Sequence, residues 1–296
     1  MENKFIIVTD ATCDIPETLS DKDFYMIPME YIMDDGNVYT CGKEDSLSNT
    51  DFYKMLREGH QAKTSQISPK AGMDFLRPYL DQGYDVLNIS FSGALSATAD
   101  NMEQACKTLS EEYPDRKLYS LDSKITTNGL GMLCAEAIKL RKQGKTIEEV
   151  RDRIAYLIPK QNIYFTVDDL MHLYRGGRLP KAAALAGTVM RIKPLLYITP
   201  GGALRNIEKV MSKKLCYRRM AEIVKHQSSD LTEWFSVGQA DNREEAEKLA
   251  QKVSEVTGIT KYYITELSPI IGCHSGAGTL AVNFFGKDNL DIKSAD

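Results

Sequence analysis

The sequence predicts an α/β protein of two domains, a parallel-sheet domain over residues 1–160 and a mixed α/β domain over residues 161–296. In the first half, short apolar segments alternate with amphipathic helices, which is the pattern of crossover connections and a parallel sheet. The second half contains a hairpin signal and more closely spaced strands. A length of 296 residues also suits two domains. The boundary near residue 160 rests on this change of pattern alone.

The first half is expected to contain strands at 5–9, 85–90 and 117–121, and helices at 50–58, 69–82, 96–113, 128–143 and 146–159. In the helix at 96–113, apolar residues recur every three or four positions and therefore share one face. Thr146 and Glu149 have the spacing of a capping box, which marks the start of the last helix.

The second half is expected to contain strands at 163–167, 195–199, 203–207, 233–237 and 261–266, and helices at 181–191, 208–227 and 242–256. Pro200-Gly201-Gly202 separates two apolar segments and indicates a hairpin turn. We therefore expect a sheet that is rich in antiparallel pairs.

Composition argues against several classes of protein. The 37 basic and 41 acidic residues give a net charge of −4, which is unfavourable for wrapping nucleic acid. The absence of a long apolar run and of a signal-peptide pattern leads us to expect a cytoplasmic protein without a membrane span. The six cysteines include no CxxC pair and the four histidines form no HExxH motif. We therefore expect no disulfide framework, no metal and no cofactor.

Three polar segments stand where predicted strands end, which is where open α/β sheets bind ligands. They are 64–69, 90–98 and 270–278. Ser96 lies near a predicted helix N-terminus, where free N–H groups favour an anion. His274 lies in an expected glycine-rich turn after an apolar strand, and its ring can donate a hydrogen bond to an anion. Helix capping for the first two segments, and a solvated loop for His274, remain the alternatives.

A fourth candidate is Arg175-Gly176-Gly177-Arg178, whose arginines suit contact with a phosphate or a carboxylate. A plain surface turn also explains this segment. The sequence has no GxxxxGK[ST] phosphate loop, no GxGxxG fingerprint and no GxSxG nucleophile elbow. A nucleotide site or a hydrolase site is therefore not visible.

Taken together and in order, six short motifs resemble those of the DegV family of bacterial fatty-acid-binding proteins. The motifs are Phe5-Ile6-Ile7-Val8-Thr9-Asp10 with Asp14-Ile15-Pro16, Thr64-Ser65-Gln66, Leu95-Ser96-Ala97-Thr98, Leu121-Asp122-Ser123, Arg175-Gly176-Gly177-Arg178 with Lys193-Pro194, and Ile271-Gly272-Cys273-His274-Ser275-Gly276-Ala277-Gly278. They span nearly the whole chain, and their shared order is more specific than any one of them.

The resemblance implies two α/β domains with a long-chain fatty acid between them. The acyl chain is expected in a tunnel of the C-terminal domain, and the carboxylate at the interdomain cleft. The resemblance assigns carboxylate binding to Thr64, Ser96 and His274, with the backbone N–H of Ala97. Ala97 stands where the family has glycine, which puts the carboxylate geometry in question.

The resemblance also implies a partner, because family members present the fatty acid to a separate ATP-dependent fatty acid kinase subunit that forms acyl phosphate. Arg175 corresponds to an arginine associated with that step. In this hypothesis the chain is a lipid-binding subunit of phospholipid metabolism and not an enzyme. Burying the acyl chain contributes about 0.8 kcal/mol per CH₂, so a sixteen-carbon chain supplies on the order of 10 kcal/mol before association costs.

Two other functions remain open. An acyl hydrolase would use Ser96 and His274, but no nucleophile elbow or acidic orienting residue is visible for them. A regulatory or nucleic-acid-binding protein would use the basic helix at 205–225. The same helix face could instead dock to an acidic partner or make transient contact with a membrane surface.

Overall fold

The computed structural model describes residues 4–43, 46–180 and 193–289. Its first sheet is fully parallel, with strand order β2-β1-β6-β7. The strands are β1 (Phe5–Asp10), β2 (Phe24–Ile27), β6 (Asp85–Ser90) and β7 (Leu118–Asp122). The predicted parallel sheet is confirmed, with β2 as an additional edge strand.

The second sheet is mixed, with strand order β10-β9-β8-β13-β11-β12. Only the pair β11–β12 is parallel, and the other pairs are antiparallel. The strands are β8 (Gln161–Thr166), β9 (Lys193–Ile198), β10 (Leu204–Val210), β11 (Phe235–Gln239), β12 (Tyr262–Glu266) and β13 (Leu280–Phe285). The central strand β13 has no counterpart in the sequence-based prediction.

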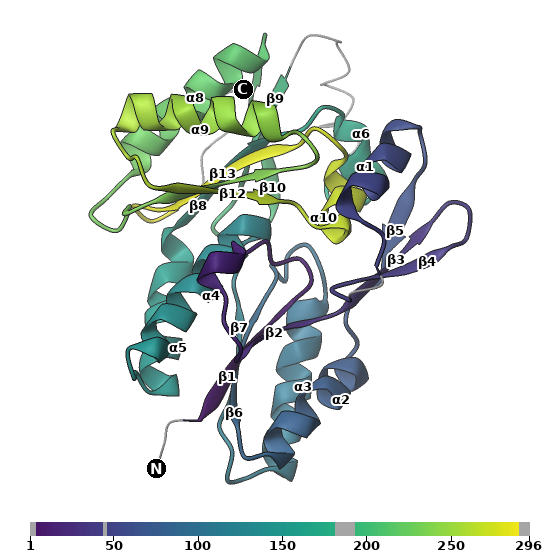
Figure 1. The fold of residues 1–296 in the computed structure, drawn as a ribbon, viewed down its shortest axis with the longest axis vertical. Helices are drawn as coiled ribbons and strands as arrows, with labels where there is room; N and C mark the ends of the chain where they lie inside the picture. The colour runs from purple at the N-terminus through teal and green to yellow at the C-terminus, as the bar shows by residue number, and fades with distance from the viewer. Residues whose placement is uncertain (1–3, 44–45, 181–192, 290–296) are drawn as a thin grey trace.

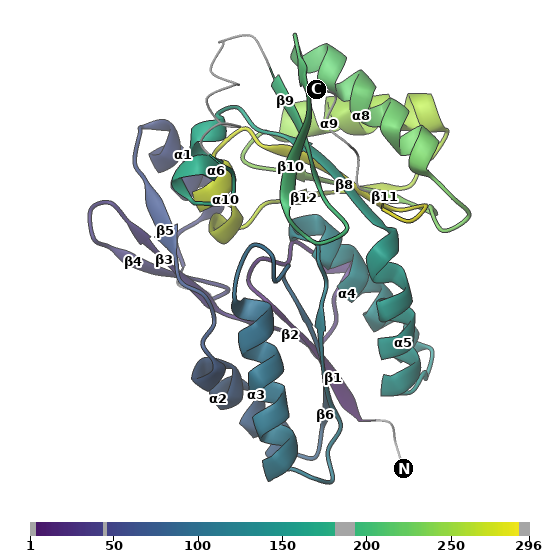
Figure 2. The ribbon, with the colours of Figure 1, turned by 180° about the vertical axis from the view of Figure 1, so that it is seen from behind.

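Helices cover the faces of both large sheets, as Figures 1 and 2 show from opposite sides. The outer face of the second sheet is covered by α8 (Lys213–Gln227) and α9 (Arg243–Thr257), and the outer face of the first by α2 (Pro69–Asp81) and α3 (Thr98–Glu112). The other face of the first sheet is covered by α4 (Thr127–Lys142) and α5 (Ile147–Leu157), and their apolar core continues into the second sheet. The helix α4 contacts strands of both sheets, so the two halves of the chain are packed together through it.

A third, small antiparallel sheet with order β4-β3-β5 stands beside these layers. It consists of β3 (Met29–Met33), β4 (Val38–Cys41) and β5 (Ala62–Thr64). Its buried residues pack against α1 (Asn49–Arg57) and α10 (Pro269–Ser275). Although α10 comes near the end of the chain, it therefore lies against the small sheet of the first half, as Figure 1 also shows. The remaining elements of the described residues are η1 (Glu17–Leu19), η2 (Ile158–Lys160) and α6 (Leu170–Arg175).

The capping box at Thr146 and Glu149 is present, and the predicted hairpin joins β9 to β10. Two predicted elements are wrong. Residues 208–210 belong to β10, where Glu208 pairs with Leu195, so the helix expected over 208–227 begins only at Lys213. The apolar segment before His274 is the helix α10 and not a strand. Such a short apolar run has no decisive periodicity, and the proline at its first position suits a helix start. The helix expected at 181–191 lies outside the described residues.

Asp14 connects the two halves of the chain at the start of α10. Its Oδ1 accepts a hydrogen bond from the backbone N–H of Ser268 at 2.9 Å. Its Oδ2 is buried and has no hydrogen-bond partner among the described residues. Burial raises the pKa of the Asp14 carboxyl well above its ordinary value, and the neighbouring Glu266 and Asp10 raise it further.

We expect Asp14→Asn to raise the thermal stability at pH 7 and to leave it nearly unchanged at pH 4. Because the folded protein holds the Asp14 proton more tightly than the unfolded chain, this proton stabilises the fold below about pH 4, and the stabilisation is lost as the pH rises through the folded pKa. Asparagine is neutral at every pH and still accepts from Ser268. Calorimetry from pH 4 to 8 measures the difference, with Asp115→Asn as a control on an exposed aspartate. An Asp14→Asn variant that melts below the wild type at pH 7 would show that the fold needs the Asp14 anion.

Candidate functional site

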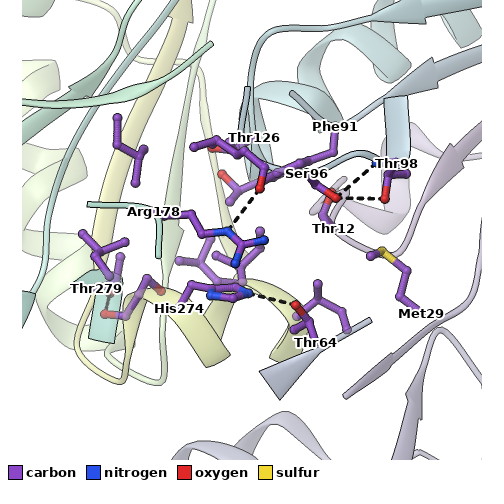
Figure 3. Close-up of a pocket in the computed structure, with 18 of the residues that line it drawn as sticks. Thr12, Met29, Thr64, Phe91, Ser96, Thr98, Thr126, Arg178, His274 and Thr279 are labelled. Atoms are coloured by element: carbon purple, nitrogen blue, oxygen red, sulfur yellow. Dashed lines mark hydrogen bonds between the residues drawn. The ribbon is translucent and has the colours of Figure 1, made fainter. Parts of the chain in front are cut away.

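A cavity of about 430 Å³ lies where the first sheet, the small sheet and the second sheet meet (Figure 3). Its apolar wall comes from both halves of the chain and consists of Met29, Phe91, Leu95, Ile163, Phe165, Leu173, Leu204, Leu267, Ile270, Ile271 and Ala281. Its polar lining consists of Thr12, Thr64, Ser65, Gln66, Ser96, Thr98, Thr126, Thr127, Arg178, His274, Ser275 and Thr279. The cavity is large enough for a small-molecule ligand with a long apolar part.

Three residues that the sequence analysis singled out, Thr64, Ser96 and His274, line this one cavity. Thr64 ends β5, and His274 lies in the last turn of α10. The Thr64 hydroxyl is 2.9 Å from Nε2 of His274. Ser96 precedes α3, and its hydroxyl lies 3.0 Å from that of Thr98 and accepts a hydrogen bond from the Thr98 N–H. The fold therefore brings together polar groups that are far apart in the sequence.

Arg178 reaches into the cavity beside His274, as Figure 3 shows. Its Nε donates a hydrogen bond to the Leu95 carbonyl at 3.1 Å, and a terminal nitrogen donates to the Gly176 carbonyl. Burial lowers the pKa of the guanidinium. No carboxylate of the described residues forms an ion pair with Arg178. The cavity therefore presents a partly desolvated positive charge that an anionic ligand would neutralise.

His274 is uncharged at neutral pH. Burial lowers its pKa to about 4, and the positive charge of Arg178 contributes to this. A neutral imidazole donates from one nitrogen and accepts at the other. The side chain therefore serves as a hydrogen-bonding group in the cavity, while Arg178 supplies the charge.

Asp10 holds two residues of the cavity wall in place. Its carboxylate accepts hydrogen bonds from the N–H of Phe91 at 2.9 Å, from the N–H of Thr12 at 3.1 Å, and from the Thr12 hydroxyl. Burial raises the pKa of Asp10, while these hydrogen bonds act in the opposite direction. The end of β1 thus fixes the loops that carry Thr12 and Phe91.

Two predicted site residues lie outside the cavity lining. The Arg175 side chain is 40% exposed and lies 3.9 Å from Asp169 in a loose ion pair. Ala97 is the N-cap residue of α3, with φ −70° and ψ 4°. Any L-residue adopts these angles readily, so alanine at this position introduces no backbone strain. Of the two arginines in the Arg-Gly-Gly-Arg motif, it is Arg178 that faces the cavity, and the motif alone could not decide between them.

The geometry gives no support to a serine hydrolase. Ser96 is hydrogen-bonded to Thr98, and His274 to Thr64. The other ring nitrogen of His274 is buried and has no acidic partner in the described part of the chain. A Ser-His-acid triad needs a hydrogen bond between the serine and one ring nitrogen and another between the acid and the other ring nitrogen.

The basic segment at 205–225 is divided between β10 and α8. On α8, Arg218 pairs with Glu222, and Arg219 pairs with Glu208 and Glu222, which offsets part of the positive charge.

Among the residues with a described structure, no cluster of three His, Cys, Asp or Glu side chains could hold a metal ion. Within the same residues, every helix is too short or too polar to cross a bilayer.

Comparison with known proteins gives consistent matches along the whole chain. The family model described as "Uncharacterised protein, DegV family" matches residues 4–287. A DegV domain-containing protein of Clostridium perfringens is 33% identical over 96% of this chain and 98% of its own length. The crystal structure of a fatty acid binding DegV family protein from Streptococcus agalactiae is similar with a TM-score of 0.84 and 27% identity, covering 96% of this chain and 99% of that one. The structure of DegV, a fatty acid binding protein from Bacillus subtilis, has a TM-score of 0.80 and 26% identity, with coverage of 96% and 99%. The chain therefore belongs to the DegV family.

Proposed function

We propose that this protein binds a long-chain fatty acid in the cavity and presents it to a separate ATP-dependent fatty acid kinase subunit, which forms the acyl phosphate. The carboxylate lies near Arg178, His274, Thr64 and Ser96, with the Ala97 backbone N–H contributing from the start of α3. The acyl chain lies along the apolar wall. The protein itself performs no chemical step.

The main support is the juxtaposition of an apolar wall with a cation that forms no ion pair with a carboxylate of the described residues. An ion pair between Arg178 and a carboxylate would replace the hydration that the guanidinium has lost. His274, Thr64 and Ser96 would add neutral hydrogen bonds around the same carboxylate. The names of the relatives from Streptococcus agalactiae and Bacillus subtilis describe them as fatty acid binding, which points to the same ligand class.

The proposed kinase partner follows from the resemblance and from the site's chemistry. The cavity supplies hydrogen bonds and a charge, but the sequence contains no phosphate loop of the GxxxxGK[ST] type. In this proposal, phosphoryl transfer uses a nucleotide site on another chain. Arg175, the last residue of α6 and 40% exposed, is the residue proposed to take part in that step. Because the partner would use ATP, the proposal places the protein in the cytoplasm.

Purified protein is expected to carry a fatty acid that mass spectrometry identifies after denaturing extraction. Delipidated protein is expected to bind palmitate or oleate, and Ser96→Ala or His274→Ala to weaken this binding about tenfold or more, since a hydrogen bond to a charged group contributes about 1.5–3 kcal/mol. Both variants should keep a wild-type thermal transition. The protein with ATP alone should form no acyl phosphate. If no fatty acid is extracted and none binds, the proposed function is wrong.

A further inference from the structure

The two nitrogen atoms of the His274 ring have different surroundings. Nε2 faces the Thr64 hydroxyl at 2.9 Å, whereas Nδ1 is buried and has no hydrogen-bond partner among the described residues. A flip of the ring would exchange Nε2 with Cε1 and would turn the nitrogen away from Thr64. Since Nδ1 forms no hydrogen bond with a described residue, packing is what holds the ring at this edge.

Gly176 supplies this packing contact. It ends α6 and lies against the Nδ1 edge of the ring. A Cβ atom at position 176 would lie well under 3.0 Å from Nδ1 and 3.2 Å from Cγ of His274. The same atom would also lie 3.3 Å from the His172 carbonyl oxygen, so it could not shift freely toward α6. Any side chain at this position would therefore displace the imidazole.

The two adjacent glycines are needed for different reasons. Gly176 has φ −72° and ψ −5°, which any L-residue adopts, so only the lack of space excludes a side chain there. Gly177 has φ 72°, and no heavy atom lies within 4 Å of where its Cβ would be. A side chain at 177 would strain the backbone without touching the site. The chain thus offers a matched pair of positions for an experiment.

We propose that Gly176 is a positioning residue for His274. The space left by the missing side chain of Gly176 lets the imidazole lie with Nε2 toward the cavity, and in this position the ring is the Nε2–H tautomer. A neutral imidazole has one N–H. At Nδ1 this group would be buried without an acceptor, whereas at Nε2 the Thr64 hydroxyl or a ligand oxygen can accept it. The role of this N–H as a donor to a carboxylate rests on the proposed function.

Arg178 links the same glycine to the charge in the cavity. It donates a hydrogen bond to the Gly176 carbonyl and another to the Leu95 carbonyl of the first half. The loop that carries the guanidinium is therefore also the surface against which the imidazole packs. The short segment 176–178 therefore positions both the Arg178 charge and the neutral His274 donor.

Gly176→Ala is expected to weaken palmitate binding at least tenfold, while the binding of 1-hexadecanol, which has no carboxylate, changes less than threefold. Gly177→Ala is the control, and it should lower the melting temperature but keep palmitate affinity within threefold of the wild type. In a His274→Ala background, Gly176→Ala should cause no further loss of palmitate affinity. Wild-type palmitate affinity in Gly176→Ala, or an additive loss in the double variant, would overturn the proposal.

The tautomer gives a test that needs no ligand. Long-range ¹H–¹⁵N correlation spectra of the wild type, assigned through His274→Ala, should show His274 protonated at Nε2 and not at Nδ1 at pH 7. A proton at Nδ1 would overturn the inference. If wild-type protein bound no palmitate while the spectra showed the Nε2–H tautomer, the proposed function would fail and the positioning role would stand.

Discussion

Replacing Arg178 with methionine is expected to weaken the binding of a long-chain fatty acid about 10- to 100-fold. This is the effect expected when a hydrogen bond to a charged group is lost. Methionine keeps an apolar stem of similar length but removes the one cation that lines the described part of the cavity. The binding of 1-hexadecanol should change little, because the alcohol has no charge to be neutralised. Titration of delipidated protein by calorimetry or fluorescence measures both ligands.

Arg175→Met is the matched control, because it removes an arginine from the same motif that is 40% exposed and outside the cavity lining. Fatty acid affinity should stay within threefold of the wild type. Arg178→Lys should recover part of the affinity lost in the methionine variant, because it restores the charge without the planar geometry. Equal losses for palmitate and hexadecanol in Arg178→Met would mean that the arginine shapes the cavity and does not bind the carboxylate.

The sequence predicted those parts of the fold whose signals are local. The first sheet, the capping box at Thr146 and the β9–β10 hairpin depend on patterns within a few residues. The small sheet was missed because its strands are short and because Ile32, 41% exposed on the outer face of β3, hides the alternation of Met29, Tyr31 and Met33. The strand β13 is buried at every position, and it therefore has no alternation to detect.

In the candidate site, too, some features could be predicted from local motifs and others depend on tertiary packing. The hydroxyls and His274 could be named from their motifs, but their convergence depends on a contact across 210 positions between Thr64 and His274. The choice between Arg175 and Arg178 depends on the path of the chain after α6, which brings Arg178 and not Arg175 to the cavity lining. Neither feature follows from composition or periodicity, because both arise from tertiary packing.

Gly131→Ala is expected to lower the free energy of unfolding by about 2–3 kcal/mol, in the upper range for overpacking. Gly131 lies inside α4, where alanine would by itself favour the helix by about 1 kcal/mol. However, a Cβ at this position would lie 2.6 Å from the carbonyl oxygen of Asp14 and 3.0 Å from Cα of Ile15. These atoms belong to the backbone of the loop after β1, which cannot rotate away as a side chain can.

Gly72→Ala separates the gain in helix propensity from the cost of overpacking, because Gly72 is also a buried glycine within a helix, α2. There the new Cβ would meet Sδ of Met102 at 2.6 Å, the flexible end of a side chain that can adopt another rotamer. We expect Gly72→Ala to remain within about 1 kcal/mol of the wild type, since the helix propensity gained offsets the repacking. Urea unfolding at pH 7 compares the midpoints of the two variants. If Gly131→Ala were as stable as Gly72→Ala, the loop at Asp14 would be free to move, and its hydrogen bond to Ser268 could not fix the start of the helix that carries His274.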